Sequence, residues 1–160
     1  MDQTLTNYLN THNITYRRYN HPAVFTVAQS KKIKQNIPGA STKSLFLKDE
    51  HNHYYLVCLP AEKRLSKKKL KIHWNKKELN FASPHELKQE LNTTPGSVSL
   101  FAMIYAKNTM LIIDPEIWNA RLVGFHPNVN TATLVIHHKD LEKFYNSLTV
   151  EKHIISVSEE

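Results

Sequence analysis

The sequence predicts an α/β (α+β) fold: a single compact domain, residues 1–160, with helices packed on a mixed, largely antiparallel sheet. The chain has 160 residues and is 41% hydrophobic, which is enough to bury a substantial core. Short apolar runs with strand character are separated by turn residues. Helical segments lie between these runs without the regular strand–helix–strand alternation that predicts an all-parallel sheet.

The N-terminal segment predicts two helices on either side of one strand. Residues 2–11 place three apolar side chains on one helical face, and residues 14–19 alternate as a strand does. Thr26 and Gln29 stand at the spacing of a capping box, so a second helix should run to about residue 35. Pro38-Gly39 then predicts a turn that ends this unit.

The middle of the chain predicts a hairpin followed by two capped helices. Residues 42–47 and 54–59 are the clearest strands, and the polar residues 49–53 between them favour an antiparallel pair. Residues 66–72 predict a short basic helix and residues 79–82 a brief strand. Ser83, Pro84 and Glu86 supply a cap, a first-turn proline and a capping-box glutamate, so a helix should extend to residue 91.

The C-terminal half predicts further strands and one amphipathic helix. Strands are expected at residues 98–105 and 110–113, joined by residues 107–109, and at residues 121–125 and 132–136. A short helical turn should begin at Asp114-Pro115-Glu116. Residues 140–148 have helical spacing of apolar side chains, and residues 153–157 predict an edge strand.

The charge and the cysteine content narrow the class of protein. The chain has 21 Lys and Arg residues against 14 Asp and Glu, a formal net charge of +7. Such an excess suits a polyanionic partner such as nucleic acid, although a basic protein without such a partner fits equally well. The single cysteine, Cys58, rules out an internal disulfide framework and lies in an apolar run typical of a core. With no signal peptide and no apolar run near the roughly 20 residues of a membrane span, we expect a cytoplasmic protein without a membrane partner.

A turn, a polar pair and one lysine precede the first strand of the predicted hairpin. The segment IPGASTKSLFLKD, residues 37–49, places Lys43 at the start of the apolar run. A cation at the start of a rigid element suits a phosphate or a polarised carbonyl. The alternative is an ordinary surface lysine.

A dense basic segment lies between residues 62 and 78. It carries eight Lys and Arg residues with Trp74 among them, a composition that can neutralise phosphates and stack on a base. A solvated helix face is the alternative interpretation. The candidate nucleic-acid-binding residues in this segment are Lys63, Arg64, Lys67, Lys68, Lys69 and Lys71.

Two polar connections are candidate binding loops, and no metal is expected. TPGSVSLF, residues 94–101, offers a run of backbone N–H groups after a glycine. GFHPNVNTAT, residues 124–133, places His126 and Asn130 between two apolar strands, where a histidine can donate to a carbonyl, hold a water or serve a structural role. His51 and His53 lie in a polar turn and His137-His138 precedes a helix, and neither pair has the spacing of a zinc site.

Four segments together resemble a known family. HPAVFTV, IPGASTKSLFLKD, TPGSVSLF and GFHPNVNTAT occur in the order and spacing of the free-standing aminoacyl-tRNA deacylases, which are related to the editing domain inserted in bacterial prolyl-tRNA synthetase. The resemblance covers residues 16–148 and is nearest to the Ala-tRNA(Pro) deacylase branch. It implies a compact α/β domain that hydrolyses the ester of mischarged tRNA without a metal or other cofactor. It also implies the acylated 3′ end of tRNA as partner, with prolyl-tRNA synthetase as a further candidate.

The resemblance also assigns roles to individual residues. Lys43 and His126 take the catalytic positions, and the substrate loop falls on residues 96–100, with leucine where the family has proline. Ser44 and Gly124 stand where the family commonly has asparagine, and Ala102 where it often has glycine. The implied substrate-binding residues are Gly96, Ser97, Val98, Ser99, Leu100, Ser44 and Asn130, with Phe25, Thr26 and Ile33 as an apolar wall.

The implied chemistry suits these residue types. An aminoacyl ester is already activated, so the protein must position a water, or the ribose hydroxyl as an internal base, and stabilise an oxyanion. Lys43 would anchor the terminal phosphate or polarise the carbonyl, the loop backbone would hold the α-ammonium group, and His126 would orient the water or the acyl group. A small pocket would exclude cognate proline sterically. The alternatives are another mischarged substrate, carrying serine or cysteine, or a module that binds tRNA or a synthetase without catalysis.

Overall fold

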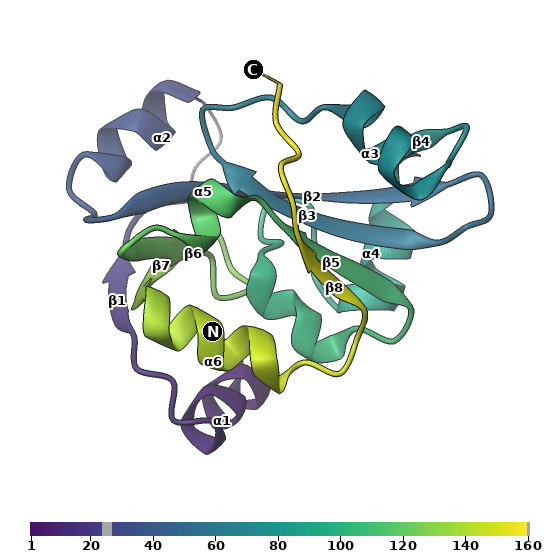
Figure 1. Cartoon of the computed structure of the whole chain (residues 1–160). Helices are drawn as coiled ribbons and strands as arrows, with labels where there is room; N and C mark the ends of the chain where they lie inside the picture. The colour runs from purple at the N-terminus through teal and green to yellow at the C-terminus, as the bar shows by residue number, and fades with distance from the viewer. Residues whose placement is uncertain (24–26, 160) are drawn as a thin grey trace.

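The computed structural model describes residues 1–23 and 27–159, and in it one sheet separates two layers of helices (Figure 1). The strand order is β1-β7-β6-β2-β3-β5-β8, and β4 pairs with β2 outside this path. The neighbours β1–β7, β6–β7, β2–β3 and β2–β4 are antiparallel, whereas β2–β6, β3–β5 and β5–β8 are parallel. The predicted mixed, largely antiparallel sheet with packed helices is therefore confirmed. The strands are β1 (Arg17–Asn20), β2 (Ala40–Asp49), β3 (Tyr54–Pro60), β4 (Leu79–Phe81), β5 (Thr109–Ile113), β6 (Leu122–Phe125), β7 (Ala132–His137) and β8 (Lys152–Ile154).

The helices begin where side chains satisfy their free N–H groups. Asp2 caps α1 by accepting from the Leu5 N–H at 2.7 Å, and Ser83 and Glu86 form the predicted capping box of α4. Ser66 caps α3 in the same way. The predicted cap of α2 at Thr26 lies outside the described residues. The helices are α1 (Gln3–Thr11), α2 (Val27–Lys34), α3 (Lys67–Trp74), α4 (Pro84–Leu91), α5 (Pro115–Trp118) and α6 (His138–Ser147).

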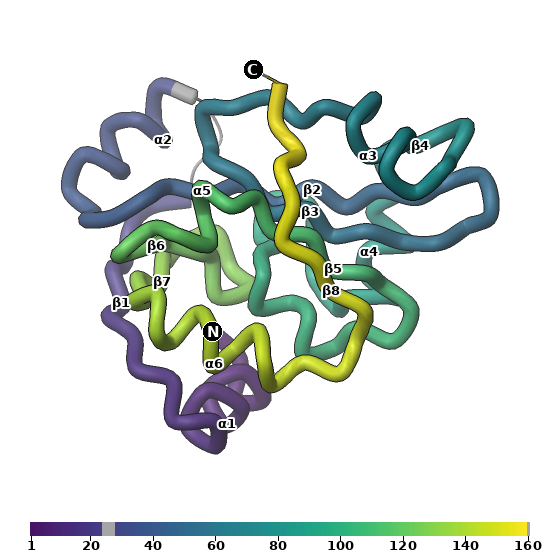
Figure 2. Tube along the Cα trace, in the orientation of Figure 1, coloured from purple at the N-terminus to yellow at the C-terminus, as the bar shows by residue number. Residues whose placement is uncertain are grey.

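β2 and β3 form the antiparallel hairpin that the sequence predicts, and it lies in the middle of the sheet. Its turn is closed by Asp49, whose Oδ1 accepts from the N–H groups of His51 and His53 at 2.8 and 3.0 Å. Asn52 supplies the left-handed conformation that the turn needs, with φ of 61°. Figure 2 shows the long hairpin crossing the molecule between α2 and α3 on one side and α1 and α6 on the other.

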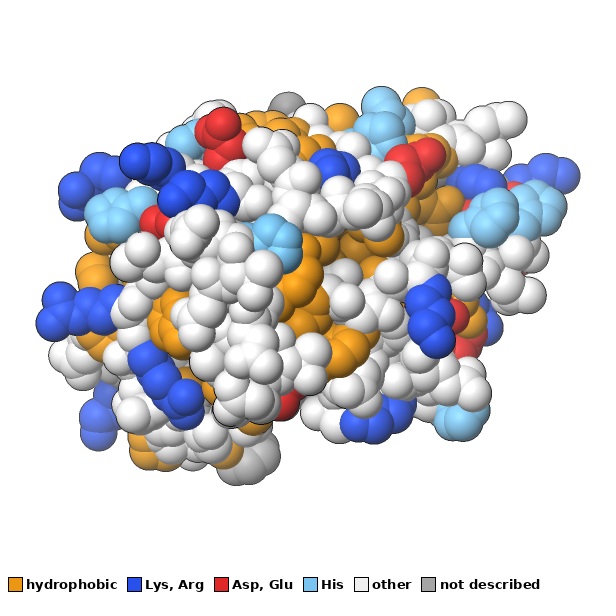
Figure 3. All heavy atoms as spheres, turned by 90° about the horizontal axis from the view of Figure 1, so that it is seen from below, with side chains coloured by type: hydrophobic (Ala, Val, Ile, Leu, Met, Phe, Trp, Pro, Cys, Tyr) orange, Lys and Arg blue, Asp and Glu red, His pale blue; other side chains and the backbone are white. Residues whose placement is uncertain are grey.

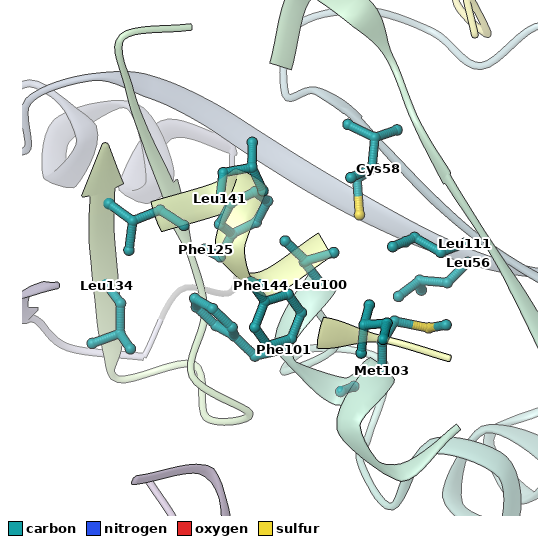
Figure 4. Packing of buried hydrophobic residues seen from close by; sticks show 14 of the residues in the cluster. Leu56, Cys58, Leu100, Phe101, Met103, Leu111, Phe125, Leu134, Leu141 and Phe144 are labelled. Carbon is teal, nitrogen blue, oxygen red and sulfur yellow. The ribbon is translucent and has the colours of Figure 1, made fainter. Parts of the chain in front are cut away.

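The two faces of the hairpin carry different cores. Ser44 and Phe46 face the larger cluster with Cys58, under α1, α4 and α6, and Figure 4 shows part of that packing. Lys43 alternates onto the opposite face with Leu45 and Leu47, where a smaller cluster packs under α3. Alternation along β2 therefore sends the side chain of Lys43 to the face that carries α2 and α3.

One predicted strand is wrong. Residues 98–105 do not pair in the sheet: Leu100–Tyr105 forms a 3₁₀ helix, η1, capped by Ser99. Leu100 and Phe101 are completely buried, and Phe101 packs edge-on against Phe125 and Phe144 with ring centroids 5.6 and 5.3 Å apart. A continuous apolar run is compatible with either a buried strand or a buried helix, and here the Ser99 cap decides for the helix.

A second difference concerns β5. The turn at residues 107–109 does not join two neighbouring strands, because β5 lies between β3 and β8 and is parallel to both. The predicted edge strand at residues 153–157 is present, with the bounds of β8. Within the described residues, every helix is too short or too polar to cross a membrane.

Candidate active site

A cavity of about 530 Å³ opens where β2 separates from β6. The parallel pairing of these strands covers only Ala40 and Ser41 of β2, and β4 joins the same edge of β2 at Leu47. The stretch between them is the floor of the cavity, and α2 forms one wall. The lining residues include Ile33, Lys34, Lys43, Ser44, Glu62, Gly96, Val98, Ser99, His21 and His126.

The backbone of β2 presents hydrogen-bonding groups to this gap. The Ser41 carbonyl accepts from the Ala61 N–H on the β3 side, at 3.0 Å, and the Phe46 carbonyl accepts from the Ala82 N–H on the opposite edge, also at 3.0 Å. Because successive residues of a strand point their N–H and C=O groups to alternate edges, those of Ser44 point toward β4 and β6. None of the described strands pairs with β2 at Ser44 on that edge. The Ser44 hydroxyl is occupied by the Cys58 sulfur at 3.3 Å, so this residue offers its backbone to a ligand.

Two glycines and one threonine hold the start of β2 against β6. Gly39 has φ of +91°, and a β-carbon there would lie 2.8 Å from the Leu122 carbonyl oxygen. A β-carbon at Gly124 would lie 2.9 Å from a methyl carbon of Thr133. The Thr42 hydroxyl donates to the Gly124 carbonyl at 2.7 Å. These contacts place Lys43 directly after the point where the two strands separate.

Lys43 shares the cavity with a second lysine that sequence reasoning missed. Lys34, at the end of α2, lines the same cavity, as does Glu62. Burial lowers the pKa of Lys34 and the charge of Lys43 lowers it further, whereas Glu62 acts in the opposite direction. Among the described residues no carboxylate lies within ion-pair distance of Lys43. The cavity therefore holds two amino groups that are close enough to repel each other.

A pair of histidines lies beside the lysines. The rings of His21 and His126 are 6.2 Å apart between centroids, and both line the cavity. The pKa of His126 is lowered from its ordinary value near 6.5, first by burial and then by the charges of His21 and Lys34. His126 is therefore neutral at pH 7, with one ring nitrogen that donates and one that accepts.

His21 is oriented by two hydrogen bonds. Its Nδ1 lies 2.9 Å from the Pro22 carbonyl oxygen, which can only accept, so Nδ1 carries the proton. In the neutral ring, Nε2 then accepts from the Thr133 hydroxyl at 3.0 Å. His21 was not singled out in the sequence, although it begins the HPAVFTV motif.

The loop before η1 is tied to His126 through one buried hydroxyl. Ser99 Oγ donates to the backbone carbonyl of His126 and accepts from the Phe101 N–H at 3.1 Å. Ser99 is only 3% exposed, so few alternative partners are available. This double hydrogen bond fixes the loop that precedes η1 relative to His126.

Of the other predicted loop residues, some line the cavity and some do not. Gly96 and Val98 line the cavity, and a β-carbon at Gly96 would lie 3.9 Å from the Asn130 amide nitrogen. Ser97 and Leu100 are not among the lining residues. The Ser97 N–H donates to Thr94 O within the turn, and the Leu100 side chain points into the core (Figure 4).

The proposed apolar wall is described only in part. Ile33 lines the cavity, whereas Phe25 and Thr26 lie outside the described residues. Asn130 is near Gly96 but is not itself a lining residue. Cys58 is a fully buried core residue, as predicted, and this burial raises the pKa of its thiol to about 12, which keeps it protonated.

The Lys and Arg residues of the basic segment are not among the cavity-lining residues, but they lie on the same side of the sheet. In Figure 1, α3 and α2 are on the same side of the β2–β3 hairpin. Lys63 pairs with Glu116 at 3.1 Å and Lys69 donates to the Ser158 carbonyl at 2.7 Å, whereas Arg64 and Lys68 are exposed. Lys67 and Lys71 on the same helix are half-buried.

The opposite side of the molecule has a different character. Figure 3 shows this face, which carries α1 and α6: hydrophobic side chains line a furrow, and Lys and Arg side chains lie mainly toward the rim. Helix α1 has no charged residue. A polyanion is therefore favoured on the side of α2 and α3. Residues 1–23 and 27–159 contain no group of three His, Cys, Asp or Glu side chains placed to hold a metal ion.

Comparison with known proteins decides the family. The family model of the aminoacyl-tRNA editing domain matches residues 21–144, which include the whole cavity lining. The chain belongs to the aminoacyl-tRNA editing domain family. An editing domain removes a wrong amino acid from tRNA, so the predicted deacylase activity is confirmed at the level of the family.

The names of several proteins similar to this editing protein mention prolyl-tRNA or prolyl-tRNA synthetase. It is 31% identical over 133 residues to the prolyl-tRNA editing protein ProX of Acetoanaerobium sticklandii, covering 81% of each chain. It is 29% identical over 128 residues to prolyl-tRNA synthetase associated domain-containing protein 1 of Danio rerio, covering 78% of this chain and 70% of that one. A solved structure described as a proposed trans-editing enzyme for prolyl tRNA synthetase aligns with a TM-score of 0.76 over 100% of this chain and 99% of that chain. Its identity of 16% limits that likeness to the fold.

Proposed function

We propose that this editing protein acts in trans on Ala-tRNA(Pro) and hydrolyses the ester that joins alanine to the 3′-terminal adenosine. The observation that carries the proposal is the convergence of Lys43, Lys34 and His126 on one cavity beside an open strand edge. The cavity volume of about 530 Å³ suits a terminal nucleotide with its amino acid better than an amino acid alone.

The reaction needs little nucleophile activation. A water oxygen forms a bond to the acyl carbon, the ester C–O bond breaks, and the ribose oxygen takes a proton. Neutral His126 accepts a hydrogen bond from the attacking water and so orients it. The developing negative charge on the acyl oxygen lies near a lysine ammonium group, which stabilises it.

Two lysines allow two tasks to be divided. Lys43 rises from the rigid floor of the cavity, where a fixed position is useful for stabilising the acyl oxygen. Lys34 stands on α2 at the wall, where a point charge suits the phosphate of the terminal nucleotide. The carbonyl of Ser44, on the unpaired edge of β2, would accept from the α-ammonium group, together with the backbone of the loop at Gly96.

Amino-acid selection rests on size. Ile33 and Val98 contribute apolar side chains to the cavity, and a steric limit would exclude proline while admitting alanine. Attraction alone would be weak, since one methylene discriminates by only about 1–3 kcal/mol. The protein would meet its substrate in the cytoplasm, after the tRNA leaves prolyl-tRNA synthetase or while it is still bound there.

The test is hydrolysis of a panel of labelled aminoacyl-tRNAs by the wild type, Lys43→Met and Lys34→Met. We expect the wild type to cleave Ala-tRNA(Pro) and spare Pro-tRNA(Pro). Lys43→Met should lower kcat by about 100-fold or more, as removal of one oxyanion donor does. Lys34→Met should act mainly on KM.

Three results would contradict the proposal. Cleavage of Ser-tRNA or Cys-tRNA with Ala-tRNA(Pro) spared would replace the substrate. Binding of tRNA without any hydrolysis would favour the non-catalytic module. Equal losses of kcat in the two lysine variants would remove the proposed division of labour.

A further inference from the structure

An exposed aromatic side chain lies beside the basic helix, outside the cavity. Among the described residues, Phe81 and Ile72 are the large hydrophobic side chains that remain exposed, by 59% and 70%. Phe81 is the last residue of β4, and the ammonium group of Lys67 lies 5.3 Å from its ring centroid. The ring of Phe81 is not part of the hydrophobic core, and its exposed face is available to stack against another flat group.

The register of the sheet places Phe81 on the face that bears Lys43. Phe81 pairs with Leu47 of β2, and directly paired residues of antiparallel strands share a face. Leu47 and Lys43 are four residues apart, so alternation puts their side chains on the same face. At about 3.3 Å per residue, the two positions are separated by about 13 Å along β2.

This distance matches a short run of nucleotides. Stacked nucleotides rise by about 3.4 Å each, so about 13 Å spans roughly four of them. A tRNA ends in a short unpaired 3′ segment, and the proposed function puts its terminal adenosine in the cavity at Lys43. Leu47 is buried under α3, so the nucleotides that precede the adenosine would follow the unpaired edge of β2 from Ser44 toward Phe81.

We propose that Phe81 is a stacking platform for one of these unpaired nucleotides, with Lys67 against the adjacent phosphate. The inference rests on the proposed function, because the cavity fixes where the 3′ end must be. An aromatic ring accepts any base on its π-face, and a neighbouring cation neutralises the backbone. Phe81 thereby joins the cavity to the basic surface of α3, which includes the exposed Lys68.

The test measures binding of uncharged tRNA, with no hydrolysis step, to the wild type, Phe81→Ala and Phe81→Tyr. Two probes are used: intact tRNA, and the same tRNA trimmed of its unpaired 3′ nucleotides. We expect Phe81→Ala to weaken binding of intact tRNA by about tenfold, as loss of one base–aromatic contact does. Phe81→Tyr should bind like the wild type, and trimmed tRNA should bind equally to all three. Ile72→Ala, which removes an exposed apolar side chain of α3, is the matched control and should bind intact tRNA like the wild type.

Other outcomes would contradict the proposal that Phe81 stacks on an unpaired nucleotide. Unchanged binding of intact tRNA by Phe81→Ala would exclude stacking, and an equal loss with trimmed tRNA would place the contact on the duplex. A tyrosine variant as weak as the alanine variant would show that the ring face is not used. Failure of the proposed function is distinguishable, because it would appear as absent hydrolysis by the wild type and would leave these binding ratios intact.

Discussion

Replacing Ser99 with alanine should destabilise the protein and impair the site together. Ser99 Oγ serves two backbone groups, the part-buried carbonyl of His126 and the buried N–H of Phe101. A buried polar group that loses its partner costs about 1–3 kcal/mol. Because the bond to the His126 carbonyl is only part-buried, water can replace part of it, and we expect the free energy of unfolding to fall by about 2–4 kcal/mol in Ser99→Ala.

The assay is urea unfolding of Ser99→Ala beside Ser97→Ala. Ser97 is in the same loop, is half-buried and has no side-chain hydrogen bond among the described residues. Its variant should stay within about 0.5 kcal/mol of the wild type. For Ser99→Ala the urea midpoint should fall with an unchanged slope, and the melting temperature should drop by on the order of 10 °C. Equal stability of the two variants would refute the reasoning that Ser99 ties the loop to the histidine.

Three further predictions concern the histidine, the turn before β2 and the basic helix. Burial, His21 and Lys34 lower the pKa of His126 below about 6.5, and the neutral ring is the active form. We therefore expect kcat to be constant above pH 6.5 and to fall as the pH drops through the pKa of His126. The His126→Gln variant should have a lower kcat, and its pH–rate profile should lack this fall at acid pH. Gly39→Ala should cost about 2 kcal/mol or more of stability, because φ is +91° and the new β-carbon would lie 2.8 Å from the Leu122 carbonyl oxygen, whereas Gly96→Ala should be nearly neutral in thermal melts. Neutralising Lys67, Lys68 and Lys69 together should weaken tRNA binding and reduce the slope of affinity against salt, and an unchanged slope would exclude α3 from the phosphate contacts.

Local signals in the sequence were sufficient for most of the secondary structure. Ser83 and Glu86 formed the predicted capping box, and the polar turn at residues 49–53 joined the predicted antiparallel strands. These elements are fixed by short-range hydrogen bonds, which a sequence motif specifies directly. The failure at residues 98–105 has a different origin. That apolar run has no period that distinguishes a buried strand from a buried helix. Ser99 caps the helix, and its hydroxyl is held in place by a hydrogen bond to the backbone carbonyl of His126, which is 27 residues away.

The candidate site shows the same limit. Lys43 and His126 stood out because each lies in a recognisable motif, and the structure brings both to one cavity. Lys34 lies in a helix of several lysines, and only the tertiary structure brings it into the cavity with Lys43, whose charge lowers the pKa of Lys34. Its spacing of three from Lys31, which also lines the cavity, was the available signal.

By itself the sequence determined the class of fold, the strand–turn–strand spine and the motifs that resemble an editing protein, because these depend on neighbours along the chain. Only the tertiary structure decided which groups meet in the cavity. The early separation of β6 from β2 frees the edge at Ser44, and the return of β4 at Leu47 sets Phe81 on the face of Lys43. Strand pairing joins residues that are tens of positions apart, and no local pattern specifies that register.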